Sequence, residues 1–192
     1  MLNLTEATLS LQAVLTTEQL SVRPIRPPDF QAVNKAFATL QSECVKQPGI
    51  VLQRFTELLL DLCAAHSAGI SVLEKNEDRL VFRWHAIAGV YAPYRWGSMP
   101  RSASPCGVVL NTEAVQLFKY PERHFPYSIP LNPPICEALL TPFRLCEQVI
   151  GTVWLIAHDE TRKFDQEDLR RMEAFLHLMT VAYENSCKML QS

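Results

Sequence analysis

The sequence lacks an excess of either charge. Its 192 residues carry 18 Lys and Arg against 20 Asp and Glu, which leaves a formal net charge of −2. Proteins that bind nucleic acid through its phosphates usually show a clear basic excess or patch. The near balance therefore argues against nucleic acid as a partner.

Long hydrophobic runs are also missing. The longest candidate, residues 149–157, is interrupted by Gly151 and Thr152 and is far shorter than the ~18 residues that a membrane helix needs. The first fifteen residues show neither the basic start nor the small-residue cleavage site of a signal peptide. We therefore expect a cytoplasmic protein without a membrane partner.

No two cysteines form a C-x-x-C pair, which argues against a zinc site or a thioredoxin-like motif. The six cysteines are Cys44, Cys63, Cys106, Cys136, Cys146 and Cys187. We expect them to be mostly reduced and buried. The five histidines lack the spacings H-x-x-x-H and H-E-x-x-H, so we also expect no metal site. A single axial histidine for haem, such as His124, stays open.

The length and the 48% hydrophobic content suit one domain with end extensions. Three prolines in residues 24–28 favour an extended linker, because proline cannot continue a helix. We therefore predict a leader over residues 1–28 and a single domain over residues 29–192, which includes helices at both ends.

Apolar residues spaced three and four apart predict three helices. The first starts after Asp29, the second runs from about residue 50 to Ala65, and the third follows Asp165 and reaches about Leu190. The stripe of the first helix comprises Phe30, Val33, Phe37, Leu40 and Cys44, and that of the last comprises Leu169, Met172, Leu176, Met179, Tyr183, Cys187 and Leu190. Such narrow stripes suit a homodimer through the terminal helices; packing within one domain is the alternative.

Alternating patterns predict two β-hairpins, over residues 68–74 with 79–87 and over residues 136–146 with 149–158. Between them, residues 90–134 hold eight prolines and read as a long insert, a common place for functional residues. This order of elements predicts an α+β fold with an antiparallel sheet.

Several short motifs in order resemble a GAF domain over about residues 45–190. They are Met99-Pro100-Arg101, Ser104-Pro105-Cys106-Gly107, Pro121-Glu122-Arg123-His124-Phe125, Cys136-Glu137 and the strand after it, Ile150-Gly151-Thr152-Val153-Trp154, and Phe164-Asp165-Gln166-Glu167-Asp168. The details look most like the GAF modules of bacterial sensor histidine kinases. No kinase follows in this sequence, so we expect a stand-alone module.

The resemblance implies helices on one face of the sheet and, on the other, a small-molecule pocket that the insert roofs. It implies a regulatory, non-catalytic module of bacterial two-component signalling, with a ligand and a signalling partner of unknown identity. The candidate ligand-binding residues are Trp84, Tyr91, Trp96, Arg101, Ser104, Cys106, Phe118, Tyr120, Arg123, His124 and Glu137. Alternatively, Arg101 or Arg123 simply pairs with Glu137 and holds the insert down.

Two known GAF ligands find little support in the residues. Covalent bilin attachment uses a Cys-His pair, and no cysteine here precedes a histidine. Cyclic-nucleotide GAF domains carry an Asn-Lys pair and an Asp-Glu at the end of Phe-x-x-x-Asp-Glu, whereas this chain has Asp168 followed by Leu169. The identity of any cofactor therefore stays unknown.

An enzymatic alternative is a thiol-dependent reductase similar to free methionine-R-sulfoxide reductases, which are GAF enzymes. Cys106-Gly107 and Cys136-Glu137 resemble their cysteine and acidic segments. Ser104 is a candidate N-cap with Pro105 as the first helical residue, a placement that favours a thiolate at Cys106. Cys136 would then resolve the sulfenic acid. A further alternative is a degenerate scaffold for protein interactions, whose pocket is filled by its own aromatic side chains.

Overall fold

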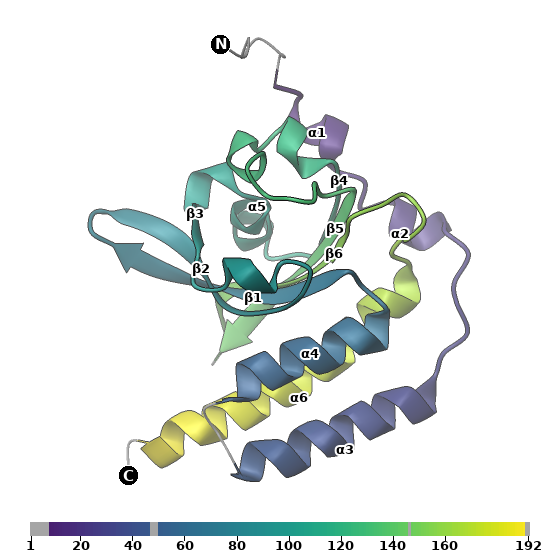
Figure 1. Ribbon diagram of the computed structural model, residues 1–192, viewed down its shortest axis with the longest axis vertical. Coiled ribbons are helices and arrows are strands. Elements are labelled where there is room, and N and C mark those ends of the chain that lie inside the picture. Colours follow the sequence, from purple (N-terminus) through teal and green to yellow (C-terminus); the bar gives the residue numbers. More distant parts are fainter. Residues whose placement is uncertain (1–7, 47–49, 146, 191–192) are drawn as a thin grey trace.

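The protein is described by a computed structural model covering residues 8–46, 50–145 and 147–190. Its centre is a six-stranded sheet in the order β3-β2-β1-β6-β5-β4. Every neighbouring pair is antiparallel. Helices cover one face of this sheet, while the opposite face is covered by the chain between β2 and β5 (Figure 1). The predicted α+β class with an antiparallel sheet is confirmed.

Two long hairpins make up the middle of the sheet, as predicted. The first joins β1 (Ser67–Asn76) to β2 (Arg79–Gly89), and the second joins β5 (Glu137–Leu145) to β6 (Gln148–Ala157). The edges are short strands that the sequence reading missed, β3 (Ser98–Pro100) and β4 (Gln116–Lys119). Both lie in the proline-rich insert, where three or four residues are too few to show an alternating pattern.

Three long helices lie on one face, as the 3.6-residue periodicity predicted (Figure 1). They are α3 (Phe30–Lys46), α4 (Val51–Cys63) and α6 (Gln166–Leu190). Helix α6 begins with an acidic capping box: Asp165 Oδ1 accepts from the backbone N–H of Asp168 at 3.1 Å, and Asp168 Oδ2 accepts from that of Asp165 at 3.0 Å. Phe55 of α4 stacks on Phe175 of α6, with ring centroids 4.9 Å apart.

Some residues of the apolar stripes on the terminal helices are buried within the domain itself. Leu40 of α3 and Leu169, Met172 and Leu176 of α6 are buried in the core between helices and sheet, whereas Phe30 is 66% exposed. Cys44, Met179, Tyr183, Cys187 and Leu190 lie outside the residues whose side chains are described, as does Cys146. The homodimer therefore stays a prediction.

Residues 8–28, assigned to a leader, lie against the domain. Helix α1 (Leu11–Val14) packs on the insert side and α2 (Gln19–Val22) on the helix side; Val14 and Leu20 are buried in the two different cores. Leu15 forms an antiparallel bridge with Phe118 of β4. Residues 24–29 have no regular structure, in keeping with the predicted effect of the prolines. The segment thus crosses the β4 edge of the sheet.

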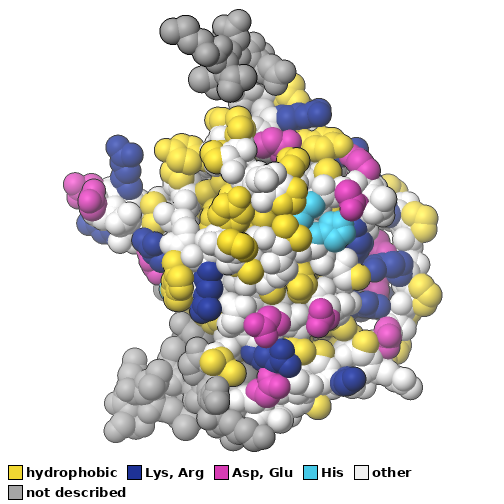
Figure 2. Space-filling view, in the orientation of Figure 1, with side chains coloured by type: hydrophobic (Ala, Val, Ile, Leu, Met, Phe, Trp, Pro, Cys, Tyr) yellow, Lys and Arg dark blue, Asp and Glu magenta, His cyan; other side chains and the backbone are white. Residues whose placement is uncertain are grey.

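The sheet separates two hydrophobic cores. Val153 and Leu155 of β6 point into the core under the helices, while Trp154 and Ile156 point into the core under the insert. Both faces of β6 are therefore covered by apolar cores. The surface of the insert itself carries exposed apolar side chains, Val90, Trp96, Tyr127 and Ile129, and Figure 2 shows hydrophobic side chains gathered in the upper part of the molecule.

Candidate functional site

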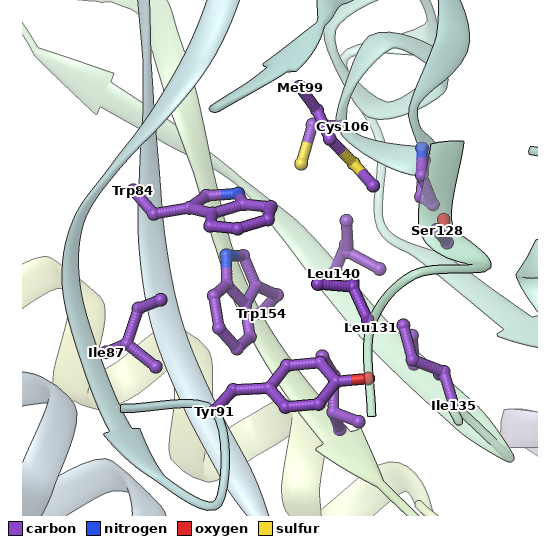
Figure 3. Close-up of a pocket in the computed structure, with 13 residues that line it drawn as sticks. Trp84, Ile87, Tyr91, Met99, Cys106, Ser128, Leu131, Ile135, Leu140 and Trp154 are labelled. Atoms are coloured by element: carbon purple, nitrogen blue, oxygen red, sulfur yellow. The ribbon is translucent and has the colours of Figure 1, made fainter. Parts of the chain in front are cut away.

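A cavity lies between the sheet and the insert (Figure 3). The strands supply the floor, and helix α5 (Pro105–Thr112) and the loops around it supply the roof. The lining is almost entirely apolar: Trp84, Ile87, Tyr91, Met99, Pro105, Cys106, Ser128, Leu131, Ile135, Ala138, Leu140, Trp154 and Ile156. No charged side chain of the described residues lines it. The cavity volume is about 50 Å³, more than the ~10–15 Å³ that one water needs.

The two ends of the insert are tied together and to the sheet beside this cavity. The Tyr91 hydroxyl donates to the carbonyl of Pro133 at 2.6 Å. His158, just after β6, lies with Nδ1 3.0 Å from the Pro134 carbonyl and Nε2 2.8 Å from Ser67 Oγ. If Nδ1 carries the proton, it donates to Pro134 and leaves Nε2 to accept from Ser67. The roof therefore begins and ends at one hydrogen-bonded cluster.

The polar atoms of Trp154 and Cys106, which line the cavity, are paired with Ser71 and Thr152. Ser71 Oγ of β1 accepts from Trp154 Nε1 at 2.9 Å and lies 3.7 Å from Cys106 Sγ. The Thr152 hydroxyl donates to Cys106 Sγ at 3.1 Å. The indole N–H and the thiol are thereby satisfied without a ligand.

Cys106 lies at the predicted position near the start of a helix, but its thiol differs from the expected thiolate. Ser104 caps α5 by accepting from the backbone N–H of Gly107 at 3.3 Å, and Pro105 is the first helical residue. Burial nevertheless raises the pKa of the Cys106 thiol, against the lowering effect of its hydrogen bonds with Thr152 and Ser71. The expectation of a thiolate is therefore wrong, because desolvation outweighs the helix amides.

Cys136 lies far from Cys106 along the sheet. Cys106 contacts Thr152, which pairs with Pro142 in the β5–β6 ladder. Cys136 precedes Pro142 by six residues, roughly 20 Å at about 3.3 Å per strand residue. A disulfide needs the two Cα atoms within about 7 Å. Cys136 therefore does not stand where it could resolve an oxidised Cys106.

The structure brings only three of the eleven candidate ligand residues into the cavity wall: Trp84, Tyr91 and Cys106. Ser104 is occupied as the cap of α5. Phe118 is buried in the same core beside Phe125, 6.0 Å between ring centroids, without lining the cavity. Trp96 is 54% exposed and packs edge-on against His85 at the hairpin.

The four charged or polar candidates of the insert lie away from the cavity lining. Arg101 donates to Asn111 at 2.6 Å, and Arg123 stacks over the Tyr120 ring at 4.5 Å. The Tyr120 hydroxyl contacts Glu160. His124 Nδ1 lies 2.7 Å from the Leu9 carbonyl. His124 does not line the cavity, so the residues present do not fit the haem site that a single axial histidine left open.

Glu137 faces the helices and pairs with a residue that the sequence analysis did not consider. Glu137 is fully buried and shares its strand face with Leu139 and Phe143 of the helix-side core. Arg23 donates to both of its oxygens, at 2.8 and 2.9 Å, and the Phe164 N–H donates at 2.7 Å. The alternative that Arg101 or Arg123 pairs with Glu137 is therefore wrong.

Most residues of the cavity wall were not predicted from the sequence. Met99, Ser128, Leu131 and Ile135 come from the insert, whose irregular backbone shows no period from which an inward face can be predicted. Ala138, Leu140 and Ile156 belong to strands that are apolar on both faces, so alternation alone does not identify the cavity side.

Comparison with known proteins identifies the family. The sequence profile of the GAF domain matches residues 46–184. The chain belongs to the GAF domain family. No curated protein matches its sequence. Among the described residues, no helix is long and apolar enough to cross a membrane, and no group of three or more His, Cys, Asp or Glu side chains is arranged to hold a metal ion.

Solved GAF structures share the fold at low sequence identity. The GAF domain from Acinetobacter phosphoenolpyruvate-protein phosphotransferase has a TM-score of 0.64 at 14% identity, over 80% of this chain and 93% of that one. The GAF-B domain of DevS from Mycobacterium smegmatis has a TM-score of 0.59 at 19% identity, covering 76% and 98%. The free methionine-R-sulfoxide reductase from Neisseria meningitidis, in complex with its substrate, has a TM-score of 0.61 at 12% identity, over 87% of this chain and 98% of that one. At these identities the likeness concerns the GAF fold alone.

Proposed function

We propose that this GAF domain is a non-catalytic sensory module that binds one small, mainly apolar molecule in the cavity beneath residues 90–135. The observation that carries the proposal is the cavity itself, which lies on the sheet face opposite the helices and has an apolar wall. Transfer of an apolar molecule from water to such a wall is favourable. The neutral, buried thiol of Cys106 supports binding over catalysis.

A route from the cavity to the helices runs through the N-terminal segment. Leu15 pairs with Phe118 beside the insert, and Arg23 holds Glu137 and the Phe164 carbonyl at the approach to α6. A ligand that binds one setting of the insert more tightly would shift the population of this segment and of α6. We propose that α3 and α6 carry the change to a second copy and to a signalling partner in the cytoplasm, as in a bacterial two-component system.

Filling the cavity tests this function. The Ala138→Leu variant adds three carbon atoms at a residue that lines the cavity, and Ala38→Leu adds them on an exposed face of α3. Isothermal titration with toluene as the probe should show one saturable site in the wild type and in Ala38→Leu, and none in a folded Ala138→Leu protein. Equal binding by both variants would place the site elsewhere and overturn the proposal.

The small size of the cavity favours a second candidate, a scaffold for protein interactions whose cavity is closed by its own side chains. Ligand pockets for drug-sized molecules usually hold about 300–1,000 Å³, well above the 50 Å³ found here. A scaffold of this kind would bind no toluene, and Ala138→Leu would raise its melting temperature because the added carbons fill an unused space.

A further inference from the structure

A groove at the edge of the sheet differs in chemistry from the apolar cavity. It lies between helix α6, the second half of β5 and the loop that joins α5 to β4. Strand β4 pairs only with residues 137–140 of β5, so β5 runs past the end of β4 and borders this groove. The groove volume is about 790 Å³, within the ~300–1,000 Å³ of small-molecule sites.

Part of the groove lining is apolar. Val115 of the loop and Leu176 of α6 line it, and both also pack in the helix-side core. Leu176 is accompanied on α6 by Glu173, His177 and Thr180, a spacing that places all four on one face of the helix. An alkyl chain in the groove would bury apolar surface against this lining.

Negative charge is in excess around the groove. Three exposed carboxylates line it, those of Glu113, Glu147 and Glu173, against one guanidinium, that of Arg144. Arg144 is paired with Glu113, since its Nη2 donates to Glu113 Oε2 at 2.9 Å. The carboxylates of Glu147 and Glu173 have no ion pair within the described part of the chain. With histidine counted as neutral, the occupant that complements this groove is a cation.

One hydroxyl in the groove is available to a ligand. Thr141 of β5 lines the groove and is 4% exposed. Its side chain points toward the helices, because it alternates along β5 with Leu139 and Phe143 of the helix-side core. Its hydroxyl makes no hydrogen bond with another described residue, and it is not one of the unpaired polar atoms that are sealed from solvent. Thr141 Oγ1 can therefore accept a hydrogen bond from a donor in the groove.

A protein segment that adds as a further strand fits this edge poorly. Pro142 has no N–H to donate to a neighbouring strand. The pairing of β5 with β6 is also irregular between Phe143 and Arg144, and a bulge of this kind bends a strand away from regular pairing. These features favour a small flexible ligand over a strand.

We propose that the groove binds a linear aliphatic polyamine. Its ammonium groups pair with Glu147 and Glu173, its methylene chain lies along Val115 and Leu176, and one N–H donates to Thr141 Oγ1. A polyamine combines separated positive charges with an apolar chain, which matches carboxylates around a partly apolar groove. The site is separate from the cavity, so this inference does not rest on the proposed function.

Isothermal titration with spermidine at low ionic strength tests the proposal. The wild type should bind one equivalent. Glu147→Gln and Glu173→Gln should each weaken binding about twofold to fivefold, the scale of an exposed ion pair. Glu77→Gln, a control that removes the same charge from the exposed turn between β1 and β2, should not change it. Equal weakening by all three variants would show general attraction of a cation to the surface and would overturn the proposal.

Two substitutions of Thr141 test the hydrogen bond. Thr141→Val keeps the shape and removes the hydroxyl, whereas Thr141→Ser keeps the hydroxyl. We expect only Thr141→Val to weaken spermidine binding, by about threefold to tenfold, the scale of one hydrogen bond. Equal affinities of the two variants, whether unchanged or weakened, would overturn the hydrogen bond to Thr141.

Toluene titration of the same proteins separates the two sites. Toluene binding should be the same in the wild type and in all the groove variants, because none of these residues lines the cavity. A wild type that binds toluene and no spermidine would overturn this inference and leave the proposed function standing. Spermidine binding without toluene binding would do the reverse.

Discussion

The guanidinium of Arg23 donates to both carboxylate oxygens of Glu137, across 114 residues of sequence. Glu137 is fully buried and the Arg23 side chain is 15% exposed. The pair joins the N-terminal segment to the first residue of β5, and Arg26 extends it by pairing with Asp165 and Asp168 at the start of α6. The N-terminal segment is thereby held against the domain by charge-assisted hydrogen bonds.

Removing Arg23 should destabilise the whole domain. Within the described part of the chain, Arg23→Ala leaves the buried Glu137 carboxylate with the Phe164 N–H as its remaining hydrogen-bond donor. We therefore expect a loss of about 2–4 kcal/mol in the free energy of unfolding, near the lower end for a broken buried ion pair. Urea unfolding followed by circular dichroism measures it. Arg79→Ala, at the exposed first residue of β2, serves as the control and should cost under about 0.5 kcal/mol. Equal stability of both variants would contradict the account.

A residue with positive φ leads to a prediction of increased stability. Ala64 ends helix α4 in the left-handed region, at φ 45° and ψ 42°, where glycine is preferred. Ala64→Gly should therefore stabilise the protein by about 0.5–1 kcal/mol. The same substitution at the exposed Ala38 within α3 should destabilise it by about 0.5–1 kcal/mol. Chemical denaturation of both variants would show whether the signs differ, and a loss of stability in Ala64→Gly would refute the assignment of the cap.

The cluster that closes the roof should make stability depend on pH. Burial lowers the pKa of His158 from its ordinary value of 6.5, and the neighbouring His66 lowers it further, against the opposing effects of the Pro134 carbonyl and Asp159. Below about pH 6.5 the unfolded chain then binds the proton more readily than the folded one, so stability falls as pH falls through this value. We expect His158→Gln to lose less stability than the wild type between pH 7.5 and 5.5 in urea titrations.

Other polar and charged side chains lie close to His158, and the comparison of variants removes their contribution. His66 stacks on His158 with ring centroids 6.1 Å apart and lies 3.8 Å from Asp159, and it is present in both proteins. The same pH dependence in wild type and His158→Gln would show that His158 does not couple roof closure to protonation.

Thiol labelling distinguishes the buried Cys63 and Cys106 from the partly exposed Cys136. Burial raises the pKa of Cys106 and Cys63, and both are buried, whereas Cys136 is partly exposed. Iodoacetamide at pH 8, followed by peptide mass spectrometry, should label Cys136 in the folded protein and reach Cys106 only after denaturation. Rapid labelling of folded Cys106 would instead support the reductase alternative.

The parts of the fold that follow from local chemistry were predictable. The helices, the two long hairpins and the caps at Ser104 and Asp165 depend on residues within a few positions of one another. The Arg23–Glu137 pair was not, because nothing in a single sequence connects two residues 114 positions apart. For the same reason Glu137, read as a ligand contact, turned out to hold the N-terminal segment.

The position of the cavity was predicted from the sequence, but most residues of its wall were not. Its position, between the sheet and the insert, followed from the resemblance to GAF domains. Its wall depended on which insert residues point inward: Ser128 does so between the exposed Tyr127 and Ile129, and proline-rich loops show no period that would indicate it. Trp96, a candidate ligand-binding residue under the resemblance, is 54% exposed and does not line the cavity.

The most direct test of a ligand site in this cavity is a methyl NMR titration with toluene. Leu140 and Ile156 line the cavity, while Leu139 and Leu155, their neighbours in sequence, lie on the opposite face of the sheet. We predict saturable shifts of the Leu140 and Ile156 methyl signals and much smaller ones for Leu139 and Leu155. Unchanged signals at high toluene concentration, or shifts centred on Leu139 and Leu155, would contradict the account.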